Sequence, residues 1–141
     1  MLYSMSSHEI DTRTRILQAS YELMEQHQGL NVSMSNIAKA ANVSRQAVYL
    51  HFASRAELMI ATTQYVDGIK GLRERLVRIE TAKTGVENIQ ACVDVWGHYI
   101  PEIYGVAKAM MMTRDTDDAM AAAWNNCMGG VRSFCKEAII A

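Results

Sequence analysis

Apolar residues recur at helical spacing along nearly the whole chain, and this pattern restricts the fold to one built from helices. Met34, Ile37, Ala38 and Ala41, for example, fall on one face of a short helix. No segment shows the alternation of apolar and polar residues that marks a half-buried strand. A single proline and 8 glycines among 141 residues leave helices little interrupted. The sequence therefore predicts an all-α protein.

Capping and turn residues divide the first part of this pattern into three helices. The first is expected to start near Asp11 and to stop at Gly29. Ser33 and Ser44 are predicted N-caps of the next two helices, because a serine hydroxyl accepts a hydrogen bond from a free amide of the first turn. Asn42 lies in the turn between them and tolerates the left-handed conformation that such a turn requires.

The remaining helices are longer. Ser54 begins a capping-box pattern, and the apolar spacing that follows predicts one unbroken helix to about Glu80. A fifth helix is expected over residues 86–99, and Pro101 is expected in the first turn of a sixth. Asp115 or Thr116 is the expected N-cap of the last helix.

Composition and charge exclude several classes of protein. With 50% hydrophobic and 21% charged residues, the chain is too apolar to be disordered. Its net charge of −1 excludes a protein that binds nucleic acid through an overall basic surface. It has no apolar run long enough to span a membrane and no signal-peptide pattern. Three cysteines without a CxxC pair favour a reducing compartment. We therefore expect a cytoplasmic protein without a membrane partner.

Motifs for catalysis and metal binding are missing from the sequence. There is no glycine-rich phosphate loop, and no cysteine is paired with a histidine at a recognisable spacing. The acidic residues between 115 and 118 lack the spacing of a calcium loop and match the start of a helix instead. The sequence predicts no catalytic residues, no metal site and no cofactor, so we do not expect an enzyme.

Residues 33–55 carry the functional signal. A short helix, a tight turn and a second short helix form the layout of a DNA-binding helix-turn-helix, whose second helix enters the major groove. Three basic residues and no acidic residue lie between positions 39 and 55. On a helical wheel Val48 and Phe52 point towards the interior. The outward-facing residues of the second helix are Arg45, Gln46, Ala47, Tyr49 and Leu50.

Each outward group matches a chemical feature of DNA. Arg45 can bind guanine O6 and N7 with two hydrogen bonds, and Gln46 can pair with the edge of adenine. Ala47 and Leu50 suit the methyl group of thymine. The residues expected at phosphate oxygens are Tyr49, His51 and Arg55.

The stretch from Arg15 to Leu23, the segment from Ser33 to Ser44 and the run Tyr49-x-His51-Phe52-x-Ser54-x-x-Glu57-Leu58 carry a family resemblance. Over residues 12 to about 62 the chain resembles the N-terminal DNA-binding domain of the tetracycline-repressor (TetR) family. The resemblance implies a dimeric bacterial repressor of a palindromic double-stranded DNA operator, released by a small effector. It also implies that Ser33 and Ser35 lie near the DNA backbone. The predicted DNA-binding set is Ser33, Ser35, Ser44, Arg45, Gln46, Ala47, Tyr49, Leu50, His51 and Arg55.

The resemblance divides the chain into a DNA-binding domain, residues 1–56, and a helical regulatory domain, residues 57–141. Family members usually continue for further helices that build the dimer, so we expect a C-terminally truncated chain with a partial regulatory domain. Two alternatives stay open. One is an all-α binding or interaction protein without a regulatory role, and the other is an inactive truncated remnant.

The second half of the chain is rich in soft and aromatic side chains. Such residues usually form the core of a helix bundle, but they also line adaptable pockets for apolar ligands. A small apolar or aromatic effector is the ligand that this composition favours. The predicted pocket residues are Trp96, Tyr99, Tyr104, Met111, Trp124 and Met128.

Overall fold

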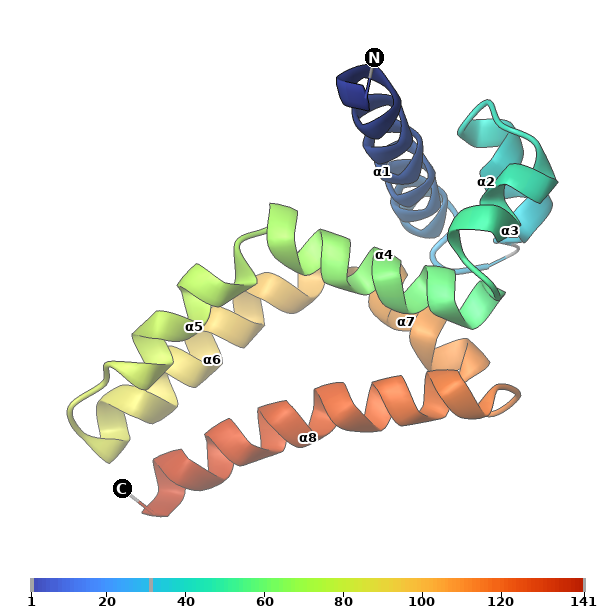
Figure 1. Ribbon diagram of the computed structural model, residues 1–141. Helices are drawn as coiled ribbons and strands as arrows, with labels where there is room; N and C mark the ends of the chain where they lie inside the picture. The colour runs from blue at the N-terminus through green and yellow to red at the C-terminus, as the bar shows by residue number, and fades with distance from the viewer. Residues whose placement is uncertain (1, 31, 141) are drawn as a thin grey trace.

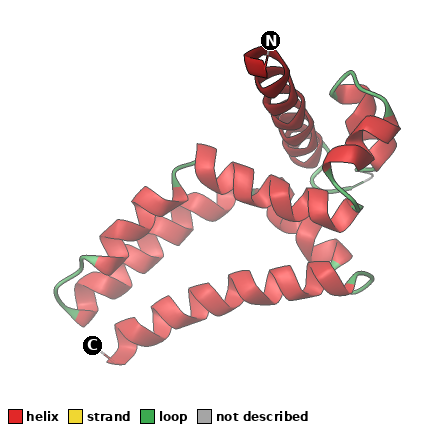
Figure 2. Ribbon diagram, in the orientation of Figure 1, coloured by secondary structure: helices red, strands yellow, loops and turns green. Residues whose placement is uncertain are grey.

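A computed structural model describes residues 2–30 and 32–140, and within these ranges every regular element is a helix (Figures 1 and 2). The all-α prediction is confirmed. None of the helices described is long and apolar enough to cross a lipid bilayer. In chain order the helices are α1 (Leu2–Gln26), α2 (Met34–Ala40), α3 (Arg45–His51), α4 (Arg55–Ile69), α5 (Leu72–Glu80), α6 (Gly85–Glu102), α7 (Tyr104–Thr113) and α8 (Asp118–Ile140).

The predicted caps of α2 and α3 are confirmed. Ser33 Oγ accepts a hydrogen bond of 3.1 Å from the amide of Asn36. Ser44 Oγ accepts one of 3.0 Å from the amide of Ala47. Between the two helices Asn42 takes the left-handed conformation, with φ of 57°. Local side-chain chemistry therefore fixes the start of both short helices and the turn that joins them.

The start of α4 is held by a reciprocal pair of hydrogen bonds. Ser54 Oγ accepts from the amide of Glu57 at 3.1 Å, and the Glu57 carboxylate accepts from the amide of Ala53 at 2.8 Å. The predicted capping box is thus confirmed, with its return bond made one residue before the cap.

The prediction of one unbroken helix to Glu80 is wrong. Helix α4 ends at Ile69, and α5 begins at Leu72 after Gly71, whose φ of 65° is left-handed. Glycine adopts this conformation without a steric penalty, which allows the chain to change direction here. Because α4 and α5 each bury one face, apolar residues keep the helical spacing on both sides of Gly71. The spacing of apolar residues therefore does not indicate the turn between the two helices.

Two other boundaries also differ from the prediction. Pro101 lies in the last turn of α6 rather than in the first turn of the next helix, and α6 ends one residue later, at Glu102. Proline has no amide hydrogen to donate, so it interrupts the helical hydrogen bonds from within. Helix α1 begins at Leu2 rather than near Asp11.

The N-cap of α8 is Asp117, not Asp115 or Thr116. Asp117 Oδ1 accepts hydrogen bonds from the amides of Ala119 at 2.9 Å and Met120 at 3.2 Å. All three candidates are good capping residues. The cap at Asp117 places Met120 in the first turn of the helix, where its side chain is buried.

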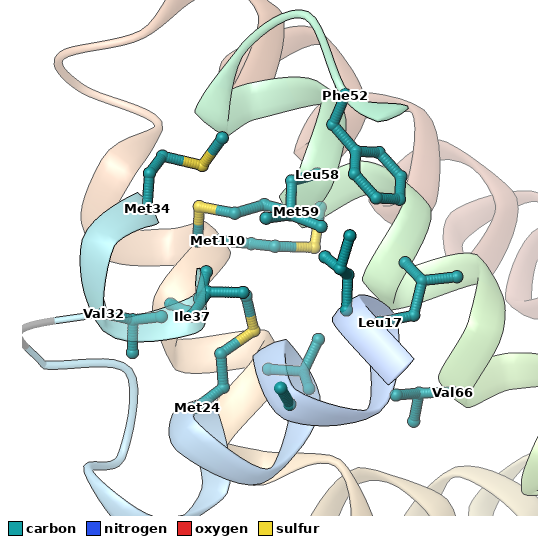
Figure 3. Packing of buried hydrophobic residues seen from close by; sticks show 14 of the residues in the cluster. Leu17, Met24, Val32, Met34, Ile37, Phe52, Leu58, Met59, Val66 and Met110 are labelled. Atoms are coloured by element: carbon teal, nitrogen blue, oxygen red, sulfur yellow. The ribbon is translucent and has the colours of Figure 1, made fainter. Parts of the chain in front are cut away.

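One main hydrophobic core joins the first helices to the rest of the molecule. Figure 3 shows side chains from α1, α2, α4 and α7 converging, among them Leu17, Ile37, Leu58 and Met110. This core contains residues from both sides of position 56, and the division into domains at that position stays a prediction. A smaller cluster around Ile79 lies between α5 and α6, which run side by side (Figure 1).

Candidate nucleic-acid interface and the adjoining cavity

The core fixes the orientation of α3. Val48 is fully buried and Phe52, just after the helix, is 2% exposed. The Arg13 guanidinium from α1 covers the Phe52 ring at 4.8 Å from its centroid. Both inward residues predicted from the helical wheel are therefore buried, and the opposite face of α3 is directed away from the protein.

The outward face of α3 is largely free of protein contacts. Leu50 is 84% exposed and Tyr49 is 40% exposed, while Arg45 and Gln46 are also exposed. Ala47 is half-buried, although the wheel placed it on the outward face. His51 is likewise half-buried, at the end of the helix. An apolar side chain as exposed as Leu50 at the centre of this face is typical of a surface that meets a partner.

Several predicted DNA contacts come together in one open depression of about 580 Å³ between α2, α3 and the start of α4. The Arg45 guanidinium lies there, 5.7 Å from the centroid of the Tyr49 ring. Such a group of hydroxyls and guanidinium groups suits the oxygens of a phosphate backbone. The predicted residues that line the depression are Ser33, Ser35, Arg45, Tyr49 and Arg55.

Arg55 has a structural contact that the sequence did not indicate. Its Nε donates a hydrogen bond of 3.0 Å to the carbonyl oxygen of Val32, which holds the segment before α2 against the first turn of α4. Asn36 of α2 also lines the depression and was absent from the predicted set. The sequence signal that could have found it is its polar side chain, which lies off the apolar face of α2 that contains Met34 and Ile37.

Between α4, α6, α7 and α8 lies a second hollow, a cavity of about 440 Å³ with almost entirely apolar walls. We refer to it as the aromatic cavity. The structure brings all six predicted pocket residues to its wall. These residues are Trp96, Tyr99, Tyr104, Met111, Trp124 and Met128.

The aromatic cavity also contains polar groups that the sequence reading missed. Thr63 and Asp67 project into it from α4, one helical turn apart. The Tyr99 hydroxyl donates a hydrogen bond to Asp67 Oδ1. Burial raises the pKa of the Asp67 carboxyl above its ordinary value, and the bond from Tyr99 offsets part of that rise. Burial also raises the pKa of the Tyr99 hydroxyl, so this group stays protonated and remains the donor.

Helix α4 touches both the DNA-binding helices and the aromatic cavity. On one face Leu58 and Met59 are buried in the main core, and the Thr62 hydroxyl is hydrogen-bonded to that of Ser20 in α1 at 2.9 Å. On another face Thr63 and Asp67 line the cavity. A displacement of α4 at the cavity would therefore also displace the groups of α1 that it packs against.

A second connection joins α7 to the end of α1. The Glu25 carboxylate accepts hydrogen bonds from the amides of Gly105 at 3.1 Å and Val106 at 3.4 Å, at the start of α7. Gly105 lies so close to α1 that a Cβ atom there would be 2.4 Å from the carbonyl oxygen of Met24. The negative charge of the Glu25 carboxylate also interacts favourably with the positive end of the α7 dipole.

The helix-turn-helix region matches a known family, and two curated proteins match a longer part of the chain. Residues 16–62 match the family described as bacterial regulatory proteins, tetR family. The nucleoid occlusion factor SlmA of Marinomonas sp. (strain MWYL1) is 32% identical over 82 residues, which is 58% of this chain and 41% of that protein. SlmA of Vibrio cholerae is 32% identical over 72 residues, 50% of this chain and 36% of that protein. No solved structure gives a significant match.

The chain thus covers less than half the length of these relatives. The family match lies on the segment that contains the capped helices α2 and α3, the exposed face of α3 and the buried residues that orient it. Sequence and geometry therefore agree on the same helix-turn-helix, and residues 16–62 match the DNA-binding segment of the tetR family of bacterial regulatory proteins.

Proposed function

We propose that the protein is a ligand-released transcriptional repressor that binds a palindromic DNA operator as a dimer. The observation that supports this most is the position of α4, which is shared by the DNA-binding helices and the aromatic cavity. Buried Leu58 and Met59 join this helix to the main core, and Thr63 and Asp67 of the same helix line the cavity.

In this proposal α3 enters the major groove and reads bases. Arg45 and Gln46 make the base-specific hydrogen bonds, and exposed Leu50 contacts a thymine methyl group. The depression beside α3 receives the phosphate backbone, with Tyr49 and Arg55 as its phosphate contacts. His51 and the hydroxyls of Ser33, Ser35 and Ser44 complete the backbone contacts.

Release follows from the position of α4. A palindromic operator presents half-sites about 34–36 Å apart, so a dimer binds well only when its two α3 helices have that spacing. An effector in the aromatic cavity pushes on Thr63 and Asp67 and favours an arrangement of α4 with a different spacing. The effector weakens DNA binding only as far as it binds that arrangement more tightly than the DNA-bound one.

Selection from a random DNA pool, with the mass of the protein and of its complex measured in the same buffer, tests the proposal. We expect a palindrome to be enriched and the complex to contain two protein chains. The matched variants are Arg45→Ala and Arg132→Ala, since Arg132 is exposed on α8, away from the depression. Only the first should weaken binding and relax the preference at one base pair of each half-site. A monomer that binds all sequences weakly would contradict the proposal.

A second candidate function comes from the two relatives, which are both named nucleoid occlusion factors. Their similarity extends over 82 and 72 residues, beyond the 47 residues spanned by 16–62 of the family match. That name links such a protein to the nucleoid rather than to a single promoter. Mapping the bound sites in cells separates the two functions, because a repressor occupies few sites, next to the genes it regulates.

A further inference from the structure

The Asp67 carboxylate has no basic partner among the residues that the structure describes. It lies in the wall of the aromatic cavity, and its hydrogen-bond donor is the neutral hydroxyl of Tyr99. None of the ion pairs found in the described ranges includes Asp67. Asp67 is half-buried, and a cation bound beside it would offset the cost of partly removing this carboxylate from water.

The charged groups near the cavity do not fill that role. Arg75 lies against the Tyr99 ring, but its guanidinium makes two hydrogen bonds to Glu102, at 3.2 and 2.8 Å, and is already neutralised. Lys108 also lines the cavity, and its ammonium lies 5.7 Å from the centroid of the Tyr104 ring. Neither makes an ion pair with Asp67, which leaves its charge available to a ligand.

The other walls of the cavity suit a flat apolar body beside a positive charge. Aromatic rings attract cations through their negative faces, and Trp96 and Tyr99 meet edge to face with their centroids 6.0 Å apart. The apolar side chains of Met111 and Met128 complete an adaptable wall. The volume of about 440 Å³ is in the range of a small-molecule site.

We propose that the aromatic cavity binds an organic cation, an aromatic or apolar amine whose ammonium group pairs with Asp67 while its ring lies among the aromatic side chains. This inference rests on the proposed function, since it names the chemical class of the effector. It narrows the apolar or aromatic effector expected from the sequence to a positively charged one.

The test uses the full chain and three probes of related shape. N-phenyl-1-naphthylamine, an uncharged fluorescent dye, reports occupation of the cavity. 1-Naphthylmethylamine, protonated at pH 7, and 1-naphthylmethanol, uncharged, then compete with the dye. Both probes can donate a hydrogen bond to Asp67, but only the ammonium group also forms an ion pair with it, so we expect the amine to compete about tenfold better than the alcohol, which corresponds to about 1.4 kcal/mol.

Two variants test whether the advantage of the amine over the alcohol depends on the charge of Asp67. Asp67→Asn keeps an oxygen to accept from Tyr99 but removes the charge, so the amine should lose its tenfold advantage while dye and alcohol bind as before. Glu80→Gln removes one negative charge from an exposed position at the end of α5, outside the cavity, and should leave the advantage intact. Dye binding by both variants verifies that the cavity is folded.

The outcomes separate this inference from the proposed function. Equal competition by amine and alcohol, or an amine advantage that survives in Asp67→Asn, would overturn the cation assignment and leave an apolar effector possible. Failure of the dye and both competitors to bind would overturn the effector cavity itself, and the cation assignment with it. Amine binding that depends on Asp67 but does not change DNA affinity would support the cation site and contradict ligand release.

Discussion

Replacing Gly105 by alanine should destabilise the protein by driving α7 away from α1. The added Cβ would lie 2.4 Å from the carbonyl oxygen of Met24 and 2.7 Å from the Cα of Glu25, whereas ordinary contacts begin at 3.4 Å. The two helices must therefore separate by about 1 Å at this point. Both neighbouring atoms belong to the backbone of α1, so no side chain can rotate away to relieve the clash.

The magnitude follows from two contributions. Overpacking of a well-filled interior costs about 1–3 kcal/mol. The shift also stretches the hydrogen bonds from the Gly105 and Val106 amides to the Glu25 carboxylate, which are 3.1 and 3.4 Å long. A weakened bond to a charged group adds about 1 kcal/mol or more. We expect Gly105→Ala to lower the free energy of unfolding by about 2–4 kcal/mol.

Gly130→Ala is the matched control, because it makes the same chemical change with the opposite expected sign. Gly130 lies inside α8, and a Cβ there would have no neighbour within 4 Å. Alanine is favoured over glycine in a helix by about 1 kcal/mol, so this variant should be more stable than the wild type. Urea unfolding of all three proteins measures the differences, with an unchanged m-value as the check on two-state behaviour.

A Gly105→Ala variant as stable as the wild type would refute the close approach of α7 and α1. The same variant offers a second measurement, because α7 carries Tyr104 and Val106 into the wall of the aromatic cavity. A shift of this helix should also weaken binding of the uncharged naphthylamine dye. Gly130→Ala should bind it as the wild type does.

Three further variants test the interface, its helix cap and the half-buried carboxylate of Asp67. Arg45→Ala should cost about 1–3 kcal/mol of DNA binding and relax the preference at one base pair, measured by repeated selection; equal weakening for all sequences would make Arg45 a phosphate contact. Ser44→Ala removes the N-cap of α3 and should lower the unfolding free energy by about 1 kcal/mol in a urea titration, unless water replaces the cap. Burial raises the pKa of Asp67 in the folded chain, so its ionisation opposes folding as the pH rises from about 4 through the folded-state pKa. Asp67→Asn should therefore be more stable than the wild type at pH 7 but not below pH 4, and an equal difference at both pH values would contradict the assignment.

The sequence predicted best those features that depend on a few neighbouring residues. Ser33, Ser44 and Ser54 cap helices through amides three residues away, and Asn42 sets a turn by its own conformation. These interactions are local, so they can be seen without knowledge of the fold. The buried position of Val48 followed in the same way from the period of a short helix.

Features that depend on tertiary structure were not predictable in this way. Gly71 breaks a helix whose apolar period continues on both sides of it. Arg55 bonds to the carbonyl of Val32, 23 positions earlier, and Asp67 meets Tyr99 across 32 positions. Residue types indicated which aromatic side chains line a cavity, but only the packing of α4 against α6 and α7 brought a carboxylate among them.

Equilibrium binding to DNA over a series of salt concentrations tests whether α3 and the adjoining depression bind DNA and distinguish its sequence. The selected palindrome and a scrambled duplex of the same composition are compared at each concentration. We expect the affinity for both duplexes to fall steeply as salt rises, because Arg45 and Arg55 in the depression displace counterions from phosphates. We also expect the palindrome to bind more tightly at every concentration. Equal affinity for the two duplexes, or no dependence on salt, would contradict the claim that α3 and the adjoining depression read DNA.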